Sequence, residues 1–175
     1  VVTVGWIAMV VFSALPFYFS GTLNYTNSFF EAMSGLTTTG ATVLGNPETI
    51  MIEDLPHGLL FWRSFTQFIG GMGIILFTIA ILPILGMGGV QLFRAEVPGP
   101  TTGKLTPTIK ETAKYLWVIY LGLIIIETIV LYLEGIIFDI EKLTFFNAIC
   151  HSMTTIATGG FSTFNNSILG FESNI

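Results

Sequence analysis

Three apolar segments, each long enough to cross a lipid bilayer, constrain the fold of this chain more than any other feature. They cover residues 1–20, about 59–85 and about 115–138. A helix that spans the hydrocarbon core of a bilayer needs about 20 apolar residues. Charged residues make up only 10% of the chain, whereas a typical soluble domain carries about 25%. These features predict an all-α membrane protein.

The distribution of basic residues indicates how these segments are oriented. Residues 86–114, between the second and third apolar segments, contain four of the six Lys and Arg residues, whereas residues 21–58 contain none. By the positive-inside rule, we expect residues 86–114 to be a cytoplasmic linker and residues 21–58 to lie outside. The stretch "EVPGPTTGKLTP" within the linker is rich in Pro and Gly, which disfavour a helix.

A repeated pattern follows the first and third apolar segments. The first copy is "FFEAMSGLTTTGATV" and the second is "FFNAICHSMTTIATGGFST". If Gly40 is aligned with Gly159, then Thr39 aligns with Thr158, and the second copy has three more residues before its Thr-Gly step. The repeating unit is therefore an apolar span, a short helix, a Thr-Gly loop and another span. Each unit holds two spans, so successive units have the same orientation in the membrane.

The short helix and its loop point to a specific kind of site. A helix of about ten residues is about 15 Å long, which is too short to cross a bilayer. Non-helical backbone at membrane depth is stable only where protein covers it or water reaches it. Threonine hydroxyls and backbone carbonyls are uncharged oxygen ligands, and rings of carbonyls select alkali cations. The C-terminal end of a helix also favours a cation. We therefore expect re-entrant loops that bind a cation.

Four strings together resemble a known family. They are "SGLTTTGATVL" (34–44), "FWRSFTQFIGGMGI" (61–74), "ILPILGMGGVQLFRAEVPGP" (81–100) and "TIATGGFST" (155–163). The chain resembles the Trk-type potassium-uptake membrane subunits of the Trk/Ktr/HKT superfamily over nearly its whole length. This resemblance implies K⁺-channel-like repeats, each made of a transmembrane helix, a re-entrant pore helix with a filter loop, and a second transmembrane helix.

The resemblance also implies how the chain is divided. Residues 1–85 would form the first of four pore repeats, with spans at 1–20 and 59–85 and the pore helix and filter at 27–43. Residues 115–175 would form the second repeat, which ends before its last span. We therefore expect the chain to be a fragment of a longer protein.

The filter residues are carried over from the family by matching motifs. K⁺, the transported ion and the one expected cofactor, would be coordinated by backbone carbonyls. The expected ligands are Thr38, Thr39 and Gly40 in the first loop and Ala157, Thr158 and Gly159 in the second. The chain would not be an enzyme.

The resemblance further implies a cellular role and partners. The expected function is potassium uptake across the bacterial inner membrane by a multi-pass protein in contact with lipid. A homodimer is expected, regulated by a cytosolic nucleotide-binding (TrkA-like) subunit, with no nucleic acid as partner. The alternative is a non-conducting membrane scaffold, or an intramembrane enzyme, whose hydroxyl-rich loops are structural. Channel and symport mechanisms both remain open.

The remaining polar residues have simpler expected roles. Glu127 lies in the middle of an apolar segment, where an acid is either functional or a satisfied structural carboxyl; we favour the structural role. Arg63 is too far along its own span to pair with Glu127, so we expect it to reach the outer surface. His57 and His151 have no metal-ligand spacing and are expected to be structural. The glycines of "IGGMGI" (69–74) predict close helix packing.

The three tryptophans lie near the ends of the predicted spans. Such positions are typical of aromatic side chains at a membrane interface. We therefore expect interfacial positions for Trp6, Trp62 and Trp117.

Overall fold

The computed structural model describes residues 2–46, 49–81 and 109–171, and all regular structure in these residues is helical. The elements are α1 (Val2–Phe19), α2 (Tyr25–Leu36), the 3₁₀ turn η1 (Ile52–Asp54), α3 (His57–Ile81), α5 (Ile109–Ile137), α6 (Phe145–Ile156) and the 3₁₀ turn η2 (Ser167–Phe171). The prediction of an all-α fold is confirmed.

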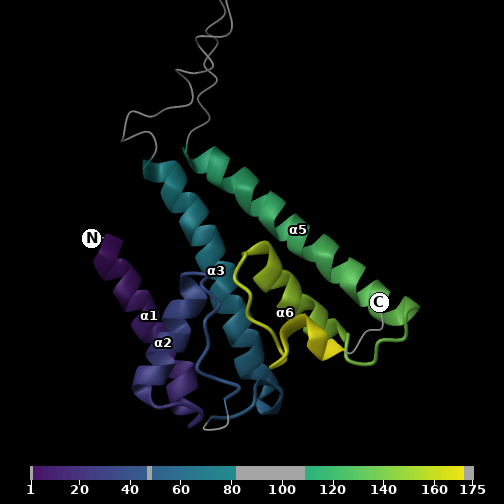
Figure 1. Cartoon of the computed structure of the whole chain (residues 1–175). Helices are drawn as coiled ribbons and strands as arrows, with labels where there is room; N and C mark the ends of the chain where they lie inside the picture. The colour runs from purple at the N-terminus through teal and green to yellow at the C-terminus, as the bar shows by residue number, and fades with distance from the viewer. Residues whose placement is uncertain (1, 47–48, 82–108, 172–175) are drawn as a thin grey trace, which may run out of the picture.

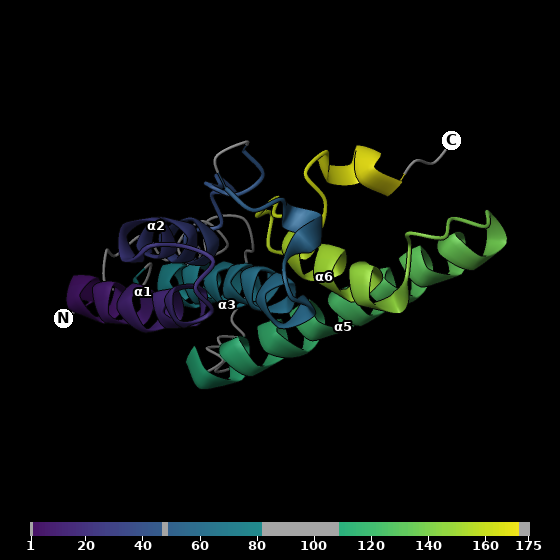
Figure 2. The same cartoon turned by 90° about the horizontal axis from the view of Figure 1, so that it is seen from below.

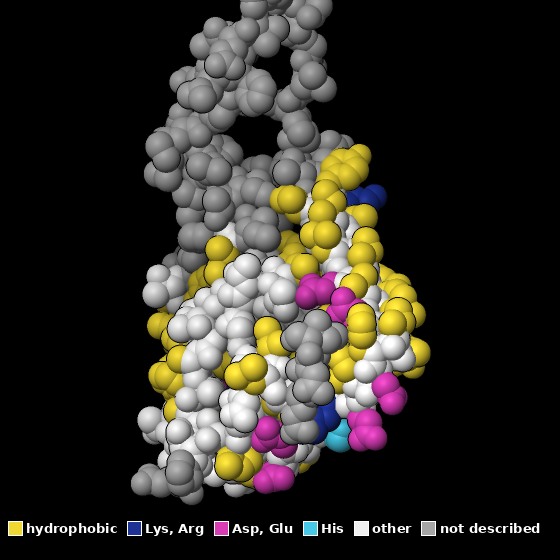
Figure 3. Space-filling model, turned by 45° about the vertical axis from the view of Figure 1, so that its right-hand side comes forward, with side chains coloured by type: hydrophobic (Ala, Val, Ile, Leu, Met, Phe, Trp, Pro, Cys, Tyr) yellow, Lys and Arg dark blue, Asp and Glu magenta, His cyan; other side chains and the backbone are white. Residues whose placement is uncertain are grey.

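The long helices correspond to the predicted apolar spans. Within the described residues, Ala113–Ile137 is the one stretch that is long and apolar enough to cross a membrane, judged by length and composition alone. The apolar part of α1, Thr3–Phe19, is shorter. The last predicted residues of the second span, 82–85, lie outside the described residues. Figure 3 shows hydrophobic side chains along the outer edge of the molecule, while acidic side chains gather mainly near its lower end.

The predicted linker is only partly described. Helix α5 begins at Ile109, so the last residues of the 86–114 stretch are helical and carry Lys110 and Lys114 onto α5. Arg94 and Lys104 lie outside the described residues. Consequently, the irregular conformation expected for "EVPGPTTGKLTP" stays a prediction.

The three long helices alternate in direction, and each short helix packs against two of them. Helix α1 runs toward the lower end of the molecule in Figure 1, α3 returns and α5 runs down again. Helix α2 packs on α1 and α3, while α6 packs on α3 and α5. Figure 2 shows both short helices on the same side of the row formed by the long helices. After each short helix the chain turns back toward the lower end (Figure 1).

Two apolar clusters hold these helices together. The larger cluster joins α1, α2 and α3 and includes the fully buried Val10, Phe17 and Leu36. The smaller cluster joins α3, α5 and α6 through Met72, Tyr120, Ile124 and Met153. Because α3 contributes to both clusters, it connects the two halves of the fold.

The glycines of the 69–74 stretch allow the close packing that the sequence predicts. A Cβ on Gly70 would overlap the carbonyl oxygen of Leu36 at the end of α2. A Cβ on Gly71 would lie 2.8 Å from the Tyr120 hydroxyl and 3.1 Å from Ala157 Cα at the end of α6. Adjacent glycines on α3 thus let the ends of both short helices approach this helix.

The tryptophans pack between helices, which the interfacial expectation did not include. Trp6 and Trp62 are partly buried against the larger cluster, and Trp117 against the smaller one. The Nε1 of Trp62 donates to the carbonyl oxygen of Ser13 at 2.9 Å, which ties α3 to α1.

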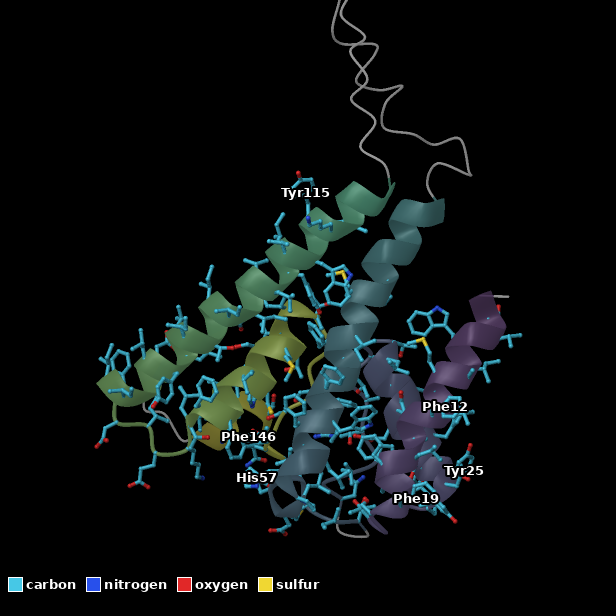
Figure 4. The ribbon with its side chains drawn as sticks, turned by 180° about the vertical axis from the view of Figure 1, so that it is seen from behind. Phe12, Phe19, Tyr25, His57, Tyr115 and Phe146 are labelled. Atoms are coloured by element: carbon cyan, nitrogen blue, oxygen red, sulfur yellow. The ribbon has the colours of Figure 1, made fainter. Side chains whose placement is uncertain are left out.

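Other aromatic side chains occupy the outer surface. In Figure 4, Phe12 and Phe19 project outward from α1 and Tyr25 lies near them at the lower end. Tyr115 lies near the opposite end of the fold, at the start of α5 (Figure 4). Aromatic side chains near helix ends are typical of membrane proteins.

Candidate functional site

The two short helices have the same length and the same kind of N-terminal cap. Helices α2 and α6 each contain 12 residues. The side chain of Asn24 accepts a hydrogen bond from the backbone N–H of Asn27 at 2.9 Å, and Thr144 accepts from Asn147 at 3.3 Å. Such caps satisfy N–H groups that have no partner within the helix. The caps therefore set the start of both helices at matching positions.

The loops that follow the short helices also share their backbone conformation. The φ angle is 53° at Thr38 and 55° at Thr158. Two residues later, φ is 75° at Gly40 and 84° at Gly160. A positive φ is uncommon for residues other than glycine and rare for β-branched ones. The same sequence of unusual angles in both loops identifies them as structural repeats.

Hydrogen bonds back to the helices confirm this match. The N–H of Thr39 donates to the carbonyl oxygen of Ser34 at 2.9 Å, and the N–H of Gly159 donates to Thr154 at 2.8 Å. Both bonds span the same number of residues, so Thr39 matches Gly159.

The alignment expected from the sequence was therefore wrong by one position. It paired Gly40 with Gly159 and Thr39 with Thr158. The structure instead pairs Gly40 with Gly160 and Thr39 with Gly159. The second copy has no additional residues before its loop, because both helices have equal length. The Phe-Phe pairs misled the alignment, since residues 29–30 lie on the second turn of α2 and residues 145–146 begin α6.

The structure brings most of the expected site residues together. Gly40 lies directly against Gly159, and a Cβ on Gly40 would overlap the Gly159 carbonyl oxygen. Thr38, Thr39 and Thr158 flank this contact on the two loops. Ala157 is different, because it is the C-terminal cap of α6 and is 3% exposed.

The loop carbonyl groups accept no hydrogen bond among the described residues, and that of the buried Gly159 packs against Gly40. Within the described part of the chain, no donor is hydrogen-bonded to the carbonyl oxygens of residues 38–40 or 158–160. Their N–H groups are used differently, since those of Thr38 and Thr158 bond to Gly35 and Thr155 of their own helices. Both loops thus direct N–H groups to the helix, while their carbonyl oxygens have no donor in the part of the chain that the structure describes.

A carboxylate supports the first loop from within the protein. Glu31, on α2, is fully buried. Its carboxylate accepts a hydrogen bond from Thr42 Oγ1 at 2.8 Å and another from the N–H of Val43 at 3.2 Å. These bonds fix the segment that follows Gly40. The sequence analysis did not identify Glu31.

The matching position on α6 holds His151, which supports the second loop in the same way. Its Nε2 lies 3.4 Å from Ser162 Oγ and 3.5 Å from the N–H of Thr163. Burial lowers the pKa of His151 to about 4, so the imidazole is neutral at pH 7. The structural role expected for His151 therefore agrees with its contacts. His57 packs at 4.7 Å from the ring of Phe146 (Figure 4), which is also structural.

Arg63 does not reach the outer surface, so that expectation was wrong. Its side chain is 1% exposed, and its Nε donates to Glu31 Oε1 at 2.9 Å. The guanidinium also lies 4.3 Å from the centre of the Phe161 ring. A buried arginine requires such a partner, because an unpaired buried charge is very unfavourable. The partner lies on another helix and was not visible in local sequence.

Gln67, one helical turn after Arg63, also contacts the second loop. Its Oε1 accepts a hydrogen bond from the N–H of Phe161 at 3.1 Å, and its amide occupies the space where a Cβ of Gly159 would lie. Residues four apart share one helix face. Two polar side chains at this spacing on an apolar helix were a signal that the sequence analysis did not use.

Glu127 lines a hollow that also reaches His151. This hollow has a volume of about 580 Å³ and is lined by Glu127, Glu134 and Thr155 among others. Arg63 pairs with Glu31. The sequence analysis expected that Arg63 would not pair with Glu127 but did not foresee Glu31 as its partner. Within the residues that the structure describes, no cluster of three or more His, Cys, Asp or Glu could hold a metal ion.

Comparison with known proteins agrees with these features. The chain is 48% identical to the Trk system potassium uptake protein TrkH of Escherichia coli K12 over 99% of its length, and 40% identical to TrkG of the same organism over 99%. It spans 34% of the length of each of these relatives.

A solved structure shares the fold. The crystal structure of the potassium transporter TrkH from Vibrio parahaemolyticus matches 99% of this chain with a TM-score of 0.77 and 41% identity, and the chain covers 32% of that protein. The fold is therefore that of an all-helical membrane protein. The TrkH family of cation transport proteins matches residues 1–175. This family comprises transporters and not enzymes, and the chain belongs to it.

Proposed function

We propose that this chain supplies two filter loops of a potassium-uptake transporter. The observation that carries the proposal is the pair of matching loops, which lie in contact and have carbonyl oxygens without hydrogen-bond donors among the described residues. Carbonyl oxygens that replace the hydration shell of an ion are the usual basis of K⁺ selection. The names of the relatives TrkH and TrkG as potassium uptake proteins support the same ion.

The short helices add an electrostatic contribution. The C-terminal ends of α2 and α6, at Thr37 and Ala157, directly precede the two loops. The C-terminal end of a helix carries about half a negative charge, which stabilises a nearby cation. Both helices therefore favour a cation near the loops.

The proposed ligands are backbone carbonyls. In the first loop they belong to Thr38, Thr39 and Gly40, as the sequence indicates. In the second, Thr158 and Gly159 are retained, and Gly160 joins them because its φ of 84° matches that of Gly40. Ala157 matches Thr37 at the helix end and is the least suited of the expected ligands.

Two loops do not enclose an ion by themselves. Four strands surround the ion in a carbonyl-lined filter. We therefore propose that this region acts within a longer protein of the kind its relatives represent, of which it spans 34%. The remaining loops would come from the rest of that protein.

The proposal also includes a membrane arrangement and partners. Residues 86–114 would face the cytoplasm and residues 21–58 the outside of a bacterial inner membrane that α1, α3 and α5 cross. A homodimer regulated by a cytosolic nucleotide-binding subunit would be the working assembly. The alternating directions of the long helices (Figure 1) support this topology.

A substitution at Gly40 tests the proposed function. Its φ of 75° and its contact with the Gly159 carbonyl make any side chain disruptive there. We expect Gly40→Ser in the full-length transporter to lower ⁸⁶Rb⁺ flux and to raise the ratio of ²²Na⁺ to ⁸⁶Rb⁺ flux into proteoliposomes. Gly21→Ser is the matched control, because Gly21 has a similar φ of 73° and no neighbour within 4 Å of an added Cβ. A normal flux ratio in Gly40→Ser would remove this loop from the filter.

A further inference from the structure

Arg63 contacts the same position in both loops. Its Nη2 donates to Thr42 Oγ1 at 3.3 Å in the first loop, and its Nη1 donates to the carbonyl oxygen of Ser162 at 2.9 Å in the second. Thr42 and Ser162 are matching residues, because each lies two positions after the positive-φ glycine of its loop. One side chain therefore bridges equivalent points of two segments that are far apart in sequence.

The groups that support the two loops from their own helices are chemically different. Glu31 supports the first loop with a carboxylate, whereas His151 supports the second with an imidazole. Glu31 is 0% exposed, so its charge needs a buried partner, and Arg63 is that partner at 2.9 Å. The ion pair holds the guanidinium of Arg63 against α2 and leaves Nη1 directed at the second loop.

We propose that Arg63 is a positioning residue for ion selection, which holds the two loops at a fixed separation by bonding to Glu31 and to the Ser162 carbonyl together. The inference rests on the proposed function, because it matters only if the loops form a filter. Arg63 has no described contact with the carbonyls of residues 38–40 or 158–160, so it acts through the segments that follow them. A change in loop separation would move these carbonyls and alter discrimination between cations.

The shape of the guanidinium is what this role requires. A guanidinium presents N–H donors in a rigid planar fork, whereas an ammonium is a compact charge on a flexible stem. In Arg63, separate nitrogens serve Glu31, Thr42 and Ser162. Arg63→Lys keeps the charge opposite Glu31 but cannot keep this planar set of bonds. The variant therefore separates the effect of charge from the effect of bridging.

The test is the flux ratio of Arg63→Lys in the full-length transporter, reconstituted in proteoliposomes at equal amounts of folded protein. We expect the ratio of ²²Na⁺ to ⁸⁶Rb⁺ flux to rise about tenfold, which corresponds to about 1.4 kcal/mol. Ser64→Ala is the control from the same helix, because the hydroxyl of Ser64 bonds to Leu60 at 3.3 Å and has no described hydrogen bond to either loop. Its flux ratio should equal that of the unmodified protein.

A second variant keeps the test decisive if Arg63→Lys does not fold. The double variant Glu31→Gln with Arg63→Met removes both buried charges, and neutral replacements of a buried ion pair are often tolerated. It also removes the bond to Ser162, so we expect the same rise in the flux ratio. An unchanged ratio in whichever variant folds overturns the positioning role.

Gly40→Ser, measured in the same series, distinguishes the two proposals. If Gly40→Ser changes the flux ratio and the Arg63 variants do not, the filter stands and the positioning role is overturned. If neither change has an effect, the proposed function is overturned as well.

Discussion

Thr38 and Thr158 adopt the same left-handed backbone conformation, with φ angles of 53° and 55°, each one residue beyond the C-terminal cap of a 12-residue helix. Such a conformation costs about 1–3 kcal/mol in a residue other than glycine and persists only where the surrounding structure requires it. The local sequences differ, since "TTTG" stands in one loop and "ATGG" in the other. The conformation is thus a property of the loop architecture.

Replacing Thr38 with glycine should relieve this strain. We expect Thr38→Gly to leave the thermal midpoint of the detergent-solubilised, full-length protein unchanged or slightly higher. Thr37→Gly is the matched control, because Thr37 has an ordinary φ of −86° and its hydroxyl donates to Met33 at 2.8 Å. There we expect a loss of about 0.5–1 kcal/mol from backbone entropy and a lower midpoint. Equal losses in both variants would contradict the role of strain.

The matched positions of Gly40 and Gly160 give a separate test at the second loop. A side chain at Gly160 would meet no atom within 4 Å, so substitution there adds strain at a φ of 84° without a collision. We expect Gly160→Ser to raise the ratio of ²²Na⁺ to ⁸⁶Rb⁺ flux, as Gly40→Ser does, while Gly21→Ser leaves it unchanged. A normal ratio in Gly160→Ser would argue against assigning it the role of Gly40.

Close packing between α3 and α2 should make Gly70 sensitive to any side chain. The Cβ of alanine at Gly70 would overlap the backbone carbonyl of Leu36, whereas at Gly73 it would lie 3.6 Å from Trp6, an ordinary contact. We expect Gly70→Ala to destabilise the protein by about 1–3 kcal/mol, seen as a lower yield and thermal midpoint. Gly73→Ala should behave like the unmodified protein. Equal stability of the two variants would contradict this packing.

The membrane orientation can be tested with single cysteines in a background where Cys150, the buried free cysteine, is replaced. Asn46→Cys, at an exposed loop position, should react with an impermeant thiol reagent added outside intact cells. Lys104→Cys, outside the described residues, should react only after the cells are opened. Labelling of Lys104→Cys from outside would reverse the proposed topology.

The sequence by itself determined the features that depend on local composition and spacing. The length of the apolar segments indicated membrane-spanning helices, because hydropathy is a property of each segment alone. The Thr-Gly loops identified the candidate site around Gly40, whose positive φ only glycine adopts readily. The glycines at 69–74 correctly indicated close packing. Each of these signals lies within one short stretch of chain.

Only the tertiary structure decided how the loops correspond and what holds them. The match of Gly40 to Gly160 depends on where α2 and α6 begin and end, which capping bonds set and the Phe-Phe pairs obscured. The burial of Arg63 depends on Glu31 of another helix, and its bond to Ser162 joins residues of different repeats. Whether a charged side chain lies inside the protein can be predicted only when its partner is known, because an unpaired buried charge is very unfavourable. That partner is brought near by packing between helices, which no local pattern of the sequence encodes.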